Sequence, residues 1–261
     1  MTALTLEDRA PRTLPRLGGL SPTLVRTELR RQLRNRRVVV FTLVLPVVLF
    51  LSVGAPQHAS TVAGVPGDAY ALVSFAVYGA MVAATSTGAA VSAERAQGWT
   101  RQLRLTPLRP GAYVAAKVLS ALALSSASAA LTLAAGALRG VRMAALDWLA
   151  VWAGAELGAL VFAALGLSVG YLLTSDNAMQ VVGPLLAVLA MLGGLFWPLE
   201  SMSPSMRELA RLLPVYGVSS IARSPLTGQH VGIGLVANVV LWGSVFAWLA
   251  ARLFRRDTAR A

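Results

Sequence analysis

The residues that could carry out chemistry in this chain are few and far apart. The two histidines, His58 and His230, lie in polar stretches between apolar runs, and the sequence contains no cysteine and no HExxH motif. A hydrolase or a metal site needs such residues held together. The only lysine, Lys117, is followed by Val118, so the Gly-Lys-Ser/Thr sequence of a phosphate-binding loop is missing. We therefore expect no catalytic residue, no metal site and no cofactor in this chain.

One acid lies well inside an apolar segment. Glu156 stands in the stretch VWAGAELGALVF, and Gly154 and Gly158 flank it. Small residues at four-residue spacing let two helices approach closely. Two interpretations remain open: Glu156 lies in a substrate path or a subunit seam, or it is a carboxylate near the membrane surface. Three aromatic residues are further candidates for a path, with packing or lipid contact as the alternative: Phe75, Tyr78 and Phe196.

The composition places these residues in a membrane protein. Hydrophobic residues make up 56% of the 261 residues and charged residues only 13%, which is outside the range of soluble domains. A helix needs about 20 apolar residues to cross a bilayer. We predict an all-α integral membrane protein with a six-helix transmembrane domain over residues 38–254. The six spans are 38–55, 69–91, 113–138, 148–173, 178–199 and 231–254.

The positive charge of the chain, a net +12, is distributed unevenly. Of the 23 lysines and arginines, 18 lie in the N-terminal region, between residues 92 and 117, or after residue 251. Cytoplasmic loops of membrane proteins keep such an excess, so six spans with both termini in the cytoplasm fit the pattern, with 255–261 as a C-terminal tail. The membrane also explains the charge better than nucleic acid does. The composition, rich in alanine, arginine and glycine, suggests a bacterial inner (cytoplasmic) membrane.

The N-terminal region divides into two parts. Residues 1–20 show no periodicity, and we predict a disordered tail. Residues 21–37 predict an interfacial helix that begins with Ser21 as its N-cap. Arginines, among them Arg30 and Arg34, fill the other faces of this helix. The alternative, that these arginines only anchor the first span, does not exclude the helix. Every fourth residue forms an apolar stripe that would face lipid: Val25, Leu29 and Leu33.

A second short helix is predicted between the fifth and sixth spans. The stretch SMSPSMRELARLL places Met206, Leu209 and Leu213 on one helical face behind a Ser-Pro start. We expect this helix to lie at, or dip into, the outer face of the membrane.

The stretch SAERAQGWTRQLRLTPLRPGAY, residues 92–113, is a polar and basic segment between two spans. Ala96, Trp99 and Leu103 are spaced three and four apart, which predicts a short amphipathic helix. Thr106 would end it, because a residue before proline avoids helical geometry. Such a helix on the cytoplasmic face could fit a groove on a partner protein. The alternative is a basic loop without a partner.

This stretch contains a pattern of residues that resembles a known protein family. Within this stretch and the start of the next span, the matching residues are Glu94-Arg95, Gly98, Leu103, Thr106-Pro107, Tyr113 and Lys117. They are similar to the segment E-R-x-x-G-(T)-x-x-x-L-x-x-T-P-(L)-x-x-x-x-Y-x-x-x-K of ABC transporter permeases of the type-2 exporter class. A second match follows the fifth span, at Gly193-Gly194, Pro198, Pro204, Pro214, Tyr216 and Arg223. Trp99 and Arg101 depart from the pattern, since the family often has a threonine and an acid there.

The resemblance implies that two permease copies form a transport path and that two separate ATP-binding subunits, which hold ATP and magnesium, dock on the 92–106 helix and on the interfacial helix. The expected cargo is a hydrophobic drug, an antibiotic or a lipid-like compound. The implied docking residues are Glu94, Arg95, Gly98, Trp99, Arg101, Leu103 and Arg104. Two other classes of protein stay open, a membrane scaffold or sensor and an ion-coupled secondary carrier.

Overall fold

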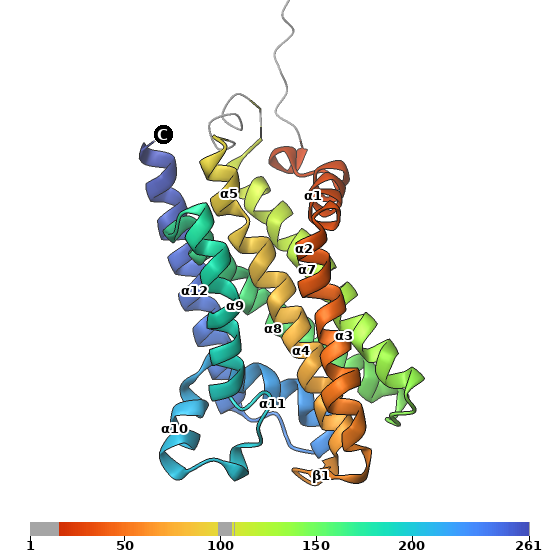
Figure 1. Cartoon of the computed structure of the whole chain (residues 1–261). Helices are drawn as coiled ribbons and strands as arrows, with labels where there is room; N and C mark the ends of the chain where they lie inside the picture. The colour runs from red at the N-terminus through yellow and green to blue at the C-terminus, as the bar shows by residue number, and fades with distance from the viewer. Residues whose placement is uncertain (1–15, 99–105, 107, 261) are drawn as a thin grey trace, which may run out of the picture.

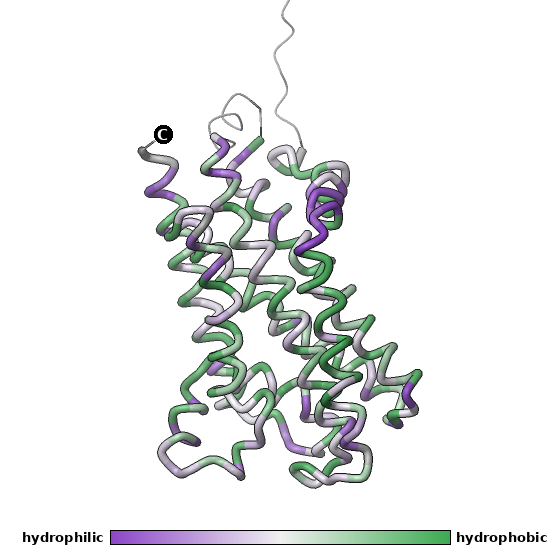
Figure 2. Tube along the Cα trace, viewed as in Figure 1, coloured by the Kyte–Doolittle hydropathy of each residue, from purple (hydrophilic) through white to green (hydrophobic). Residues whose placement is uncertain are grey.

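The computed structural model describes residues 16–98, 106 and 108–260. These residues form a bundle of long helices (Figure 1). At one end, here called the terminal end, lie α1 (Pro22–Arg34), α5 (Val91–Ala96) and the last turns of α12 (Ile233–Arg260). Figure 2 shows that hydrophilic residues gather on α1 and at this end, whereas the middle of the bundle is mostly hydrophobic.

The opposite end, here called the far end, holds shorter elements. They are a hairpin of β1 (Thr61–Val62) and β2 (Val65–Pro66), which pair antiparallel, and the helices α10 (Pro204–Leu212) and α11 (Pro214–Thr227). The sequence predicts only one helix here, which corresponds to α10. Met206 and Leu209 of that helix are more than 40% exposed. The helix α11 is a finding of the structure.

The N-terminal region differs from its prediction at two points. A short segment, η1 (Arg16–Gly19), forms inside the stretch predicted to be disordered. Ser21 caps α1 as expected, because its Oγ accepts a hydrogen bond from the Leu24 amide at 3.2 Å. The helix ends at Arg34, not at residue 37, because Asn35 leaves the helical conformation and caps the next helix with its side chain. The predicted interfacial helix is therefore three residues shorter.

Five helices in the described part of the chain are long and apolar enough to cross a membrane. They are Arg36–Gln57, Gly67–Ala96, Pro110–Leu138, Ala145–Leu172 and Ile233–Asp257. They match five of the six predicted spans within a few residues. The predicted fifth span corresponds to α9 (Ser175–Leu192), whose apolar part, Gln180–Leu192, is shorter than a crossing needs. A sixth crossing therefore stays a prediction.

The spanning helices consist of the following elements. The first is built from α2 (Arg36–Val39), η2 (Val40–Val44), α3 (Leu45–Leu49), η3 (Phe50–Gly54) and η4 (Ala55–Ala59). The next three are α4 (Gly67–Ala89) continued by α5, α7 (Pro110–Leu138) and α8 (Ala145–Leu172). The last is α12, and it continues to Arg260, so residues 255–260 extend this helix where the sequence predicts a tail. A turn, η5 (Leu199–Ser201), precedes α10.

The core of the bundle is α4. A helix that is apolar on every side is expected to be buried, and α4 has no charged residue after Asp68. In the most apolar stretch of the span that contains α4, 83% is buried inside the bundle, whereas the corresponding share in the first span is 28%. Glycines allow α8 to approach it: a Cβ on Gly166 would lie 2.2 Å from the Thr85 carbonyl oxygen, and one on Gly88 2.6 Å from the Leu167 nitrogen. The two helices therefore form one continuous seam along the bundle.

Candidate functional site

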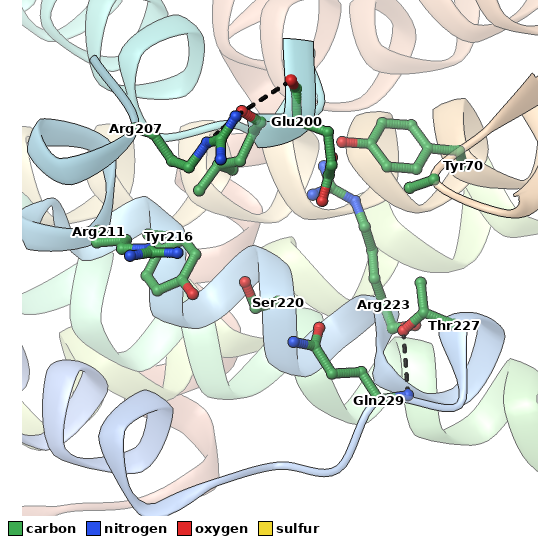
Figure 3. Close-up of a pocket in the computed structure, with 11 residues that line it drawn as sticks. Tyr70, Glu200, Arg207, Arg211, Tyr216, Ser220, Arg223, Thr227 and Gln229 are labelled. Carbon is green, nitrogen blue, oxygen red and sulfur yellow. Dashed lines mark hydrogen bonds between the residues drawn. The ribbon is translucent and has the colours of Figure 1, made fainter. Parts of the chain in front are cut away.

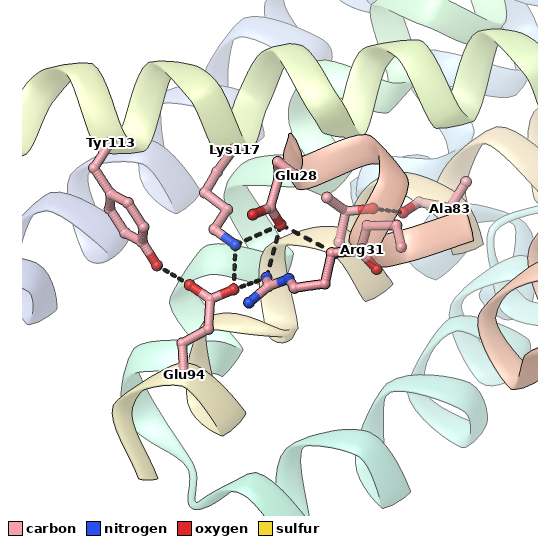
Figure 4. Close-up of polar contacts among 8 residues, drawn as sticks. Glu28, Arg31, Ala83, Glu94, Tyr113 and Lys117 are labelled. Carbon is pink, nitrogen blue, oxygen red and sulfur yellow. Dashed lines mark hydrogen bonds and ion pairs between the residues drawn. The ribbon is translucent and has the colours of Figure 1, made fainter. Parts of the chain in front are cut away.

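A buried polar cluster joins three helices at the terminal end (Figure 4). Its centre is Glu94 of α5, whose side chain is only 3% exposed. Glu94 accepts hydrogen bonds from Arg31 of α1 and from Tyr113 and Lys117 of α7. The resemblance includes Glu94, Tyr113 and Lys117 in one matching segment, and the structure brings all three into contact. A carboxylate this deeply buried requires such partners, because an unpaired charge would be very unfavourable.

A second carboxylate completes this group, which we call the Glu94 cluster: Glu28, Arg31, Glu94, Tyr113 and Lys117. The Lys117 Nζ lies 2.6 Å from the Glu28 Oε1, and the Arg31 Nη2 lies 2.8 Å from the same oxygen. Two carboxylates and two cations thus balance. Burial raises the pKa of Glu28, but the attraction of Lys117 and Arg31 outweighs burial and holds the pKa below its ordinary value. Sequence reasoning missed Glu28, although it is the only acid in an arginine-rich helix.

The Glu94 cluster borders both ends of the connection between α5 and α7. Glu94 lies just before this connection, and Tyr113 lies in the first turn of α7. The segment before α1 also contacts the end of this connection, because the Arg109 amide donates a hydrogen bond of 2.8 Å to the Gly18 carbonyl. The described residues at the two ends of this connection therefore lie next to the contacts among α1, α5 and α7, and Arg109 is also joined to η1.

The predicted helix over residues 92–106 is described only in part. Its helical start ends at Ala96, and Gly98 has a φ of 71°, a left-handed conformation that favours glycine. The prediction of one continuous helix through Gly98 is therefore wrong. Four of the implied docking residues, which are Trp99, Arg101, Leu103 and Arg104, lie outside the described residues.

Arg95 is turned into the chain and not outward toward a partner. Its Nη2 lies 2.6 Å from the Asp257 Oδ1 of α12, and its Nη1 donates to the carbonyls of Gly170 and Tyr171 at 3.2 and 3.1 Å. The guanidinium also lies over the Tyr171 ring. Glu94 and Arg95 therefore hold helices together within this chain.

The helix α1 presents two different faces. Glu28 and Gln32 point toward the bundle, whereas Arg30 and Arg34 are exposed. The predicted apolar stripe lies between these faces, with Val25 and Leu29 half-buried and Leu33 50% exposed. The bundle-facing side of α1 is thus polar, and the stripe stays partly free, as contact with lipid would require.

Gly154 and Gly158 pack within this chain. A Cβ on Gly154 would lie 2.7 Å from the Ala222 Cα, and one on Gly158 2.3 Å from a methyl group of Val218, both on α11. This face of α8 is therefore covered by α11, so the two glycines do not form a subunit seam. Glu156 points toward α7, where the Ser125 hydroxyl lies 3.1 Å from both carboxylate oxygens.

One stretch of α8 fits the GxSxG pattern of serine hydrolases, Gly166-Leu-Ser-Val-Gly170. In those enzymes the serine stands on a sharp turn next to a histidine. Here Ser168 lies inside α8, is buried, and donates to the carbonyls of Ala164 and Phe246 at 2.9 Å each. The match therefore reflects helix packing and not a nucleophile.

The three candidate aromatic residues of the path meet near the far end. The ring centroids of Phe75 and Phe196 lie 5.2 Å apart, as do those of Tyr78 and Phe196. Phe75 and Phe196 line an apolar cavity of about 470 Å³ between the first span, α4 and the segment after α9. The structure thus brings together residues that are far apart in the sequence, and their function stays a prediction.

A second, polar cavity of about 390 Å³ shares Tyr70 with the first. Figure 3 shows the residues that line it. Arg223 of α11 lines it and is only 7% exposed. Its guanidinium donates to the Gly194 carbonyl at 3.1 Å, to the Ser74 hydroxyl at 3.0 Å and to the Leu195 carbonyl, and it lies 4.1 Å from the centre of the Tyr70 ring. Sequence reasoning included Arg223 in the second family match but gave it no site.

Comparison with known proteins gives two similarities. A family model described as ABC-2 type transporter matches residues 22–226, which run from α1 to α11. The chain is also 27% identical over 234 residues to the Bacillus subtilis (strain 168) protein named "Putative transport permease YvfS". That alignment covers 89% of this chain and 96% of the relative.

Proposed function

Because this chain belongs to the ABC-2 type transporter family and is a multi-pass membrane permease, we propose that it moves its cargo with energy from separate ATP-binding subunits that dock on its terminal end. The observation that supports this proposal best is the Glu94 cluster, which joins α1, α5 and α7 beside the two ends of the 97–109 connection. The sequence contains no phosphate-binding loop of its own, in keeping with ATP hydrolysis in another subunit.

The Glu94 cluster supplies a route for mechanical coupling. When ATP-binding subunits approach one another, their force acts on the 97–109 connection. Glu94 continues the central helix α4, Tyr113 and Lys117 begin α7, and Glu28 and Arg31 belong to α1. Because buried ion pairs resist separation, these elements move together and not one by one. Binding energy at the connection thereby biases the whole bundle between two arrangements.

We further propose that two copies of this chain form one transport path in a bacterial inner membrane, with both termini in the cytoplasm, and that transport is export. The concentration of arginines at the terminal end supports this orientation. The aromatic cavity beside Phe75 and Phe196 supports a hydrophobic or amphipathic cargo, such as a drug, an antibiotic or a lipid-like compound.

The test is purification of the tagged chain from its native membrane in mild detergent, followed by identification of its partners and an ATPase assay. We expect a subunit with a nucleotide-binding sequence to co-purify. Trp99→Ala and Gly98→Pro should then uncouple ATP hydrolysis from transport while the chain still inserts. Arg139→Gln, at an exposed position between α7 and α8, is the matched control and should behave like the wild type.

Three results would contradict the proposal. Unchanged export by both variants would remove the 97–109 connection from the mechanism. Transport that follows a proton gradient without ATP would make the chain a secondary carrier. A regulatory protein as the sole partner, under conditions that keep a known ABC complex intact, would make it a scaffold or sensor.

A further inference from the structure

The polar and apolar cavities at the far end share a wall. Tyr70 lines both of them. The segment after α9 does the same, because Phe196, Trp197 and Pro198 line the apolar cavity and Leu199 and Glu200 line the polar one. Ser74 of the apolar cavity accepts a hydrogen bond from Arg223 of the polar cavity. The two cavities are therefore neighbouring halves of one region, although they differ in chemical character.

The polar half has more positive than negative charge. Arg207, Arg211 and Arg223 line it, and Glu200 is the acid among its lining residues (Figure 3). Arg211 also pairs with Glu208, at 2.7 Å, on the exposed side of α10. When both acids are counted against the three arginines, the region retains an excess of one positive charge.

Arg223, which lines this cavity, has an unused hydrogen-bond donor. Its two terminal nitrogens bind carbonyls and the Ser74 hydroxyl, but its buried Nε has no hydrogen-bond partner among the residues that the structure describes. A guanidinium has five N–H donors, and buried donors are normally satisfied. Arg207 is fixed nearby by the backbone, because its Nε donates to the Leu199 carbonyl at 3.0 Å and its Nη2 to the Glu200 carbonyl at 3.2 Å.

The apolar half has no charged residue among those that line it. Leu49 and Val53 of the first span and Phe75 and Phe196 form much of its lining. Such a surface fits an alkyl chain or a ring system, because transfer of apolar area out of water is favourable. A single ligand that fills both halves must therefore have a negatively charged group next to an apolar body.

We infer that the two cavities form one binding site for an anionic amphiphile, whose phosphate or carboxylate group lies beside Arg207 and Arg223 and whose apolar part lies against Phe75 and Phe196. This inference rests on the proposed function and adds to it the chemical class of the ligand. Charge-assisted hydrogen bonds to the arginines supply the selectivity for an anion. Burial of the apolar part supplies selectivity against a free ion such as inorganic phosphate.

The experiment uses the full chain in phosphatidylcholine nanodiscs without any ATP-binding subunit. The probe is dodecyl phosphate with a photoreactive diazirine at the end of its alkyl chain, and the control probe is the corresponding alcohol. We expect the phosphate probe to label residues 49–57 or 196–198 at least tenfold more than the alcohol does. Equal labelling by the two probes would overturn the inference.

Competition separates the sources of the anion. Phosphatidylglycerol added to the nanodiscs should reduce labelling if a membrane lipid is the natural ligand, and labelling that survives phosphatidylglycerol but falls with unlabelled dodecyl phosphate points to an amphiphile that is not this lipid. Both results support the site. Complete displacement by inorganic phosphate at the same concentration as the probe would overturn it, because the apolar half would then contribute nothing.

Variants test the polar half directly. Ser220 lines the polar cavity, so Ser220→Asp places a carboxylate where the ligand group is expected and should reduce labelling by tenfold or more. Arg207→Gln, which leaves Arg223 and the core unchanged, should reduce labelling less and serves as the second variant if Ser220→Asp folds poorly. Arg139→Gln should label like the wild type. Unchanged labelling of both cavity variants would overturn the inference, and the result is independent of whether ATPase coupling is found.

Discussion

The two ends of this bundle treat buried charge in opposite ways. At the terminal end, Glu94 and Glu28 face Lys117 and Arg31, so that charges balance within the chain. At the far end, Arg223 is equally buried, but it is held by carbonyls and a hydroxyl, and the polar cavity beside it has an excess of positive charge.

This difference separates a structural function from a binding function. In the Glu94 cluster every charge is paired, so a further ion would not be attracted to it. The cluster instead holds its helices in fixed positions relative to one another. Glu200 attracts Arg223 from nearby, but among the described residues no carboxylate forms a hydrogen bond or ion pair with Arg223. Arg223 therefore retains an attraction for an anion from outside the chain. The same physical rule underlies our two proposals, force transmission at the terminal end and ligand recognition at the far end.

The largest expected effect comes from Glu94→Gln. The change removes the carboxylate that accepts from three donors and leaves two cations facing one acid, so we expect a loss of about 3–5 kcal/mol in the free energy of unfolding. Thermal or detergent-induced unfolding of the purified chain measures it. Glu208→Gln is the control, because that side chain is 70% exposed and should cost less than about 1 kcal/mol. Similar losses in both variants would contradict the distinction between the ends.

The next effect tests the seam that runs between the ends. Gly166→Ala places a Cβ 2.2 Å from the Thr85 carbonyl oxygen, so α8 must move away from α4. We expect a cost of about 1–3 kcal/mol in the same unfolding experiment. Gly183→Ala on α9 is the control, because a Cβ there meets nothing within 4 Å. If Gly166→Ala were as stable as this control, the seam would not be a rigid connection.

Acidification should act on the terminal end through Glu28. The pKa of this carboxyl is lowered in the folded chain, so its stabilising contribution is present above the ordinary carboxyl pKa and is lost as the pH falls through the lowered value. Unfolding midpoints at pH 7 and near pH 4 should therefore differ for the wild type. The difference should be smaller for Glu28→Gln, which cannot titrate. An equal pH dependence in both proteins would remove Glu28 from the balance of the cluster.

The smallest effect is expected at the far end, and its sign is informative. Ser220→Asp adds a carboxylate to a region with an excess of positive charge, so the free energy of unfolding should rise or change by less than about 1 kcal/mol. Ser224→Asp, on the same helix but outside the cavity lining, has no such compensation and should destabilise the chain. If Ser220→Asp destabilised as much as Ser224→Asp, the positive excess at the far end would be refuted.

The sequence predicts the long helices well and their contacts poorly. Five spans follow from continuous apolar runs, because length and hydropathy alone decide whether a helix can cross a membrane. The sequence did not predict the helix α11, because this helix is short and mixes glycine, serine and arginine with apolar residues. Its presence also explains Gly154 and Gly158, whose close-packing spacing is correctly predicted but whose partner is not.

The polar sites could be predicted only as separate residues. Glu94 is an evident candidate, yet its partner Arg31 lies 63 positions away and Lys117 lies 23 positions away in the other direction. Periodicity cannot show which distant side chains meet. The inward orientation of Arg95 likewise depends on Asp257, 162 positions later, so a residue that looks exposed in the sequence proves to be part of the packing.

The location of these contacts along the chain has a consequence for biosynthesis. Every member of the Glu94 cluster lies between residues 28 and 117, so a growing chain contains all five partners once α7 has left the ribosome. The pair of Arg95 and Asp257 and the contacts of Arg223 wait for the C-terminal half. Since chains fold as they are made, N-terminal parts first, the Glu94 cluster can form during translation, whereas the Arg95–Asp257 pair and the cavities at the far end are assembled last.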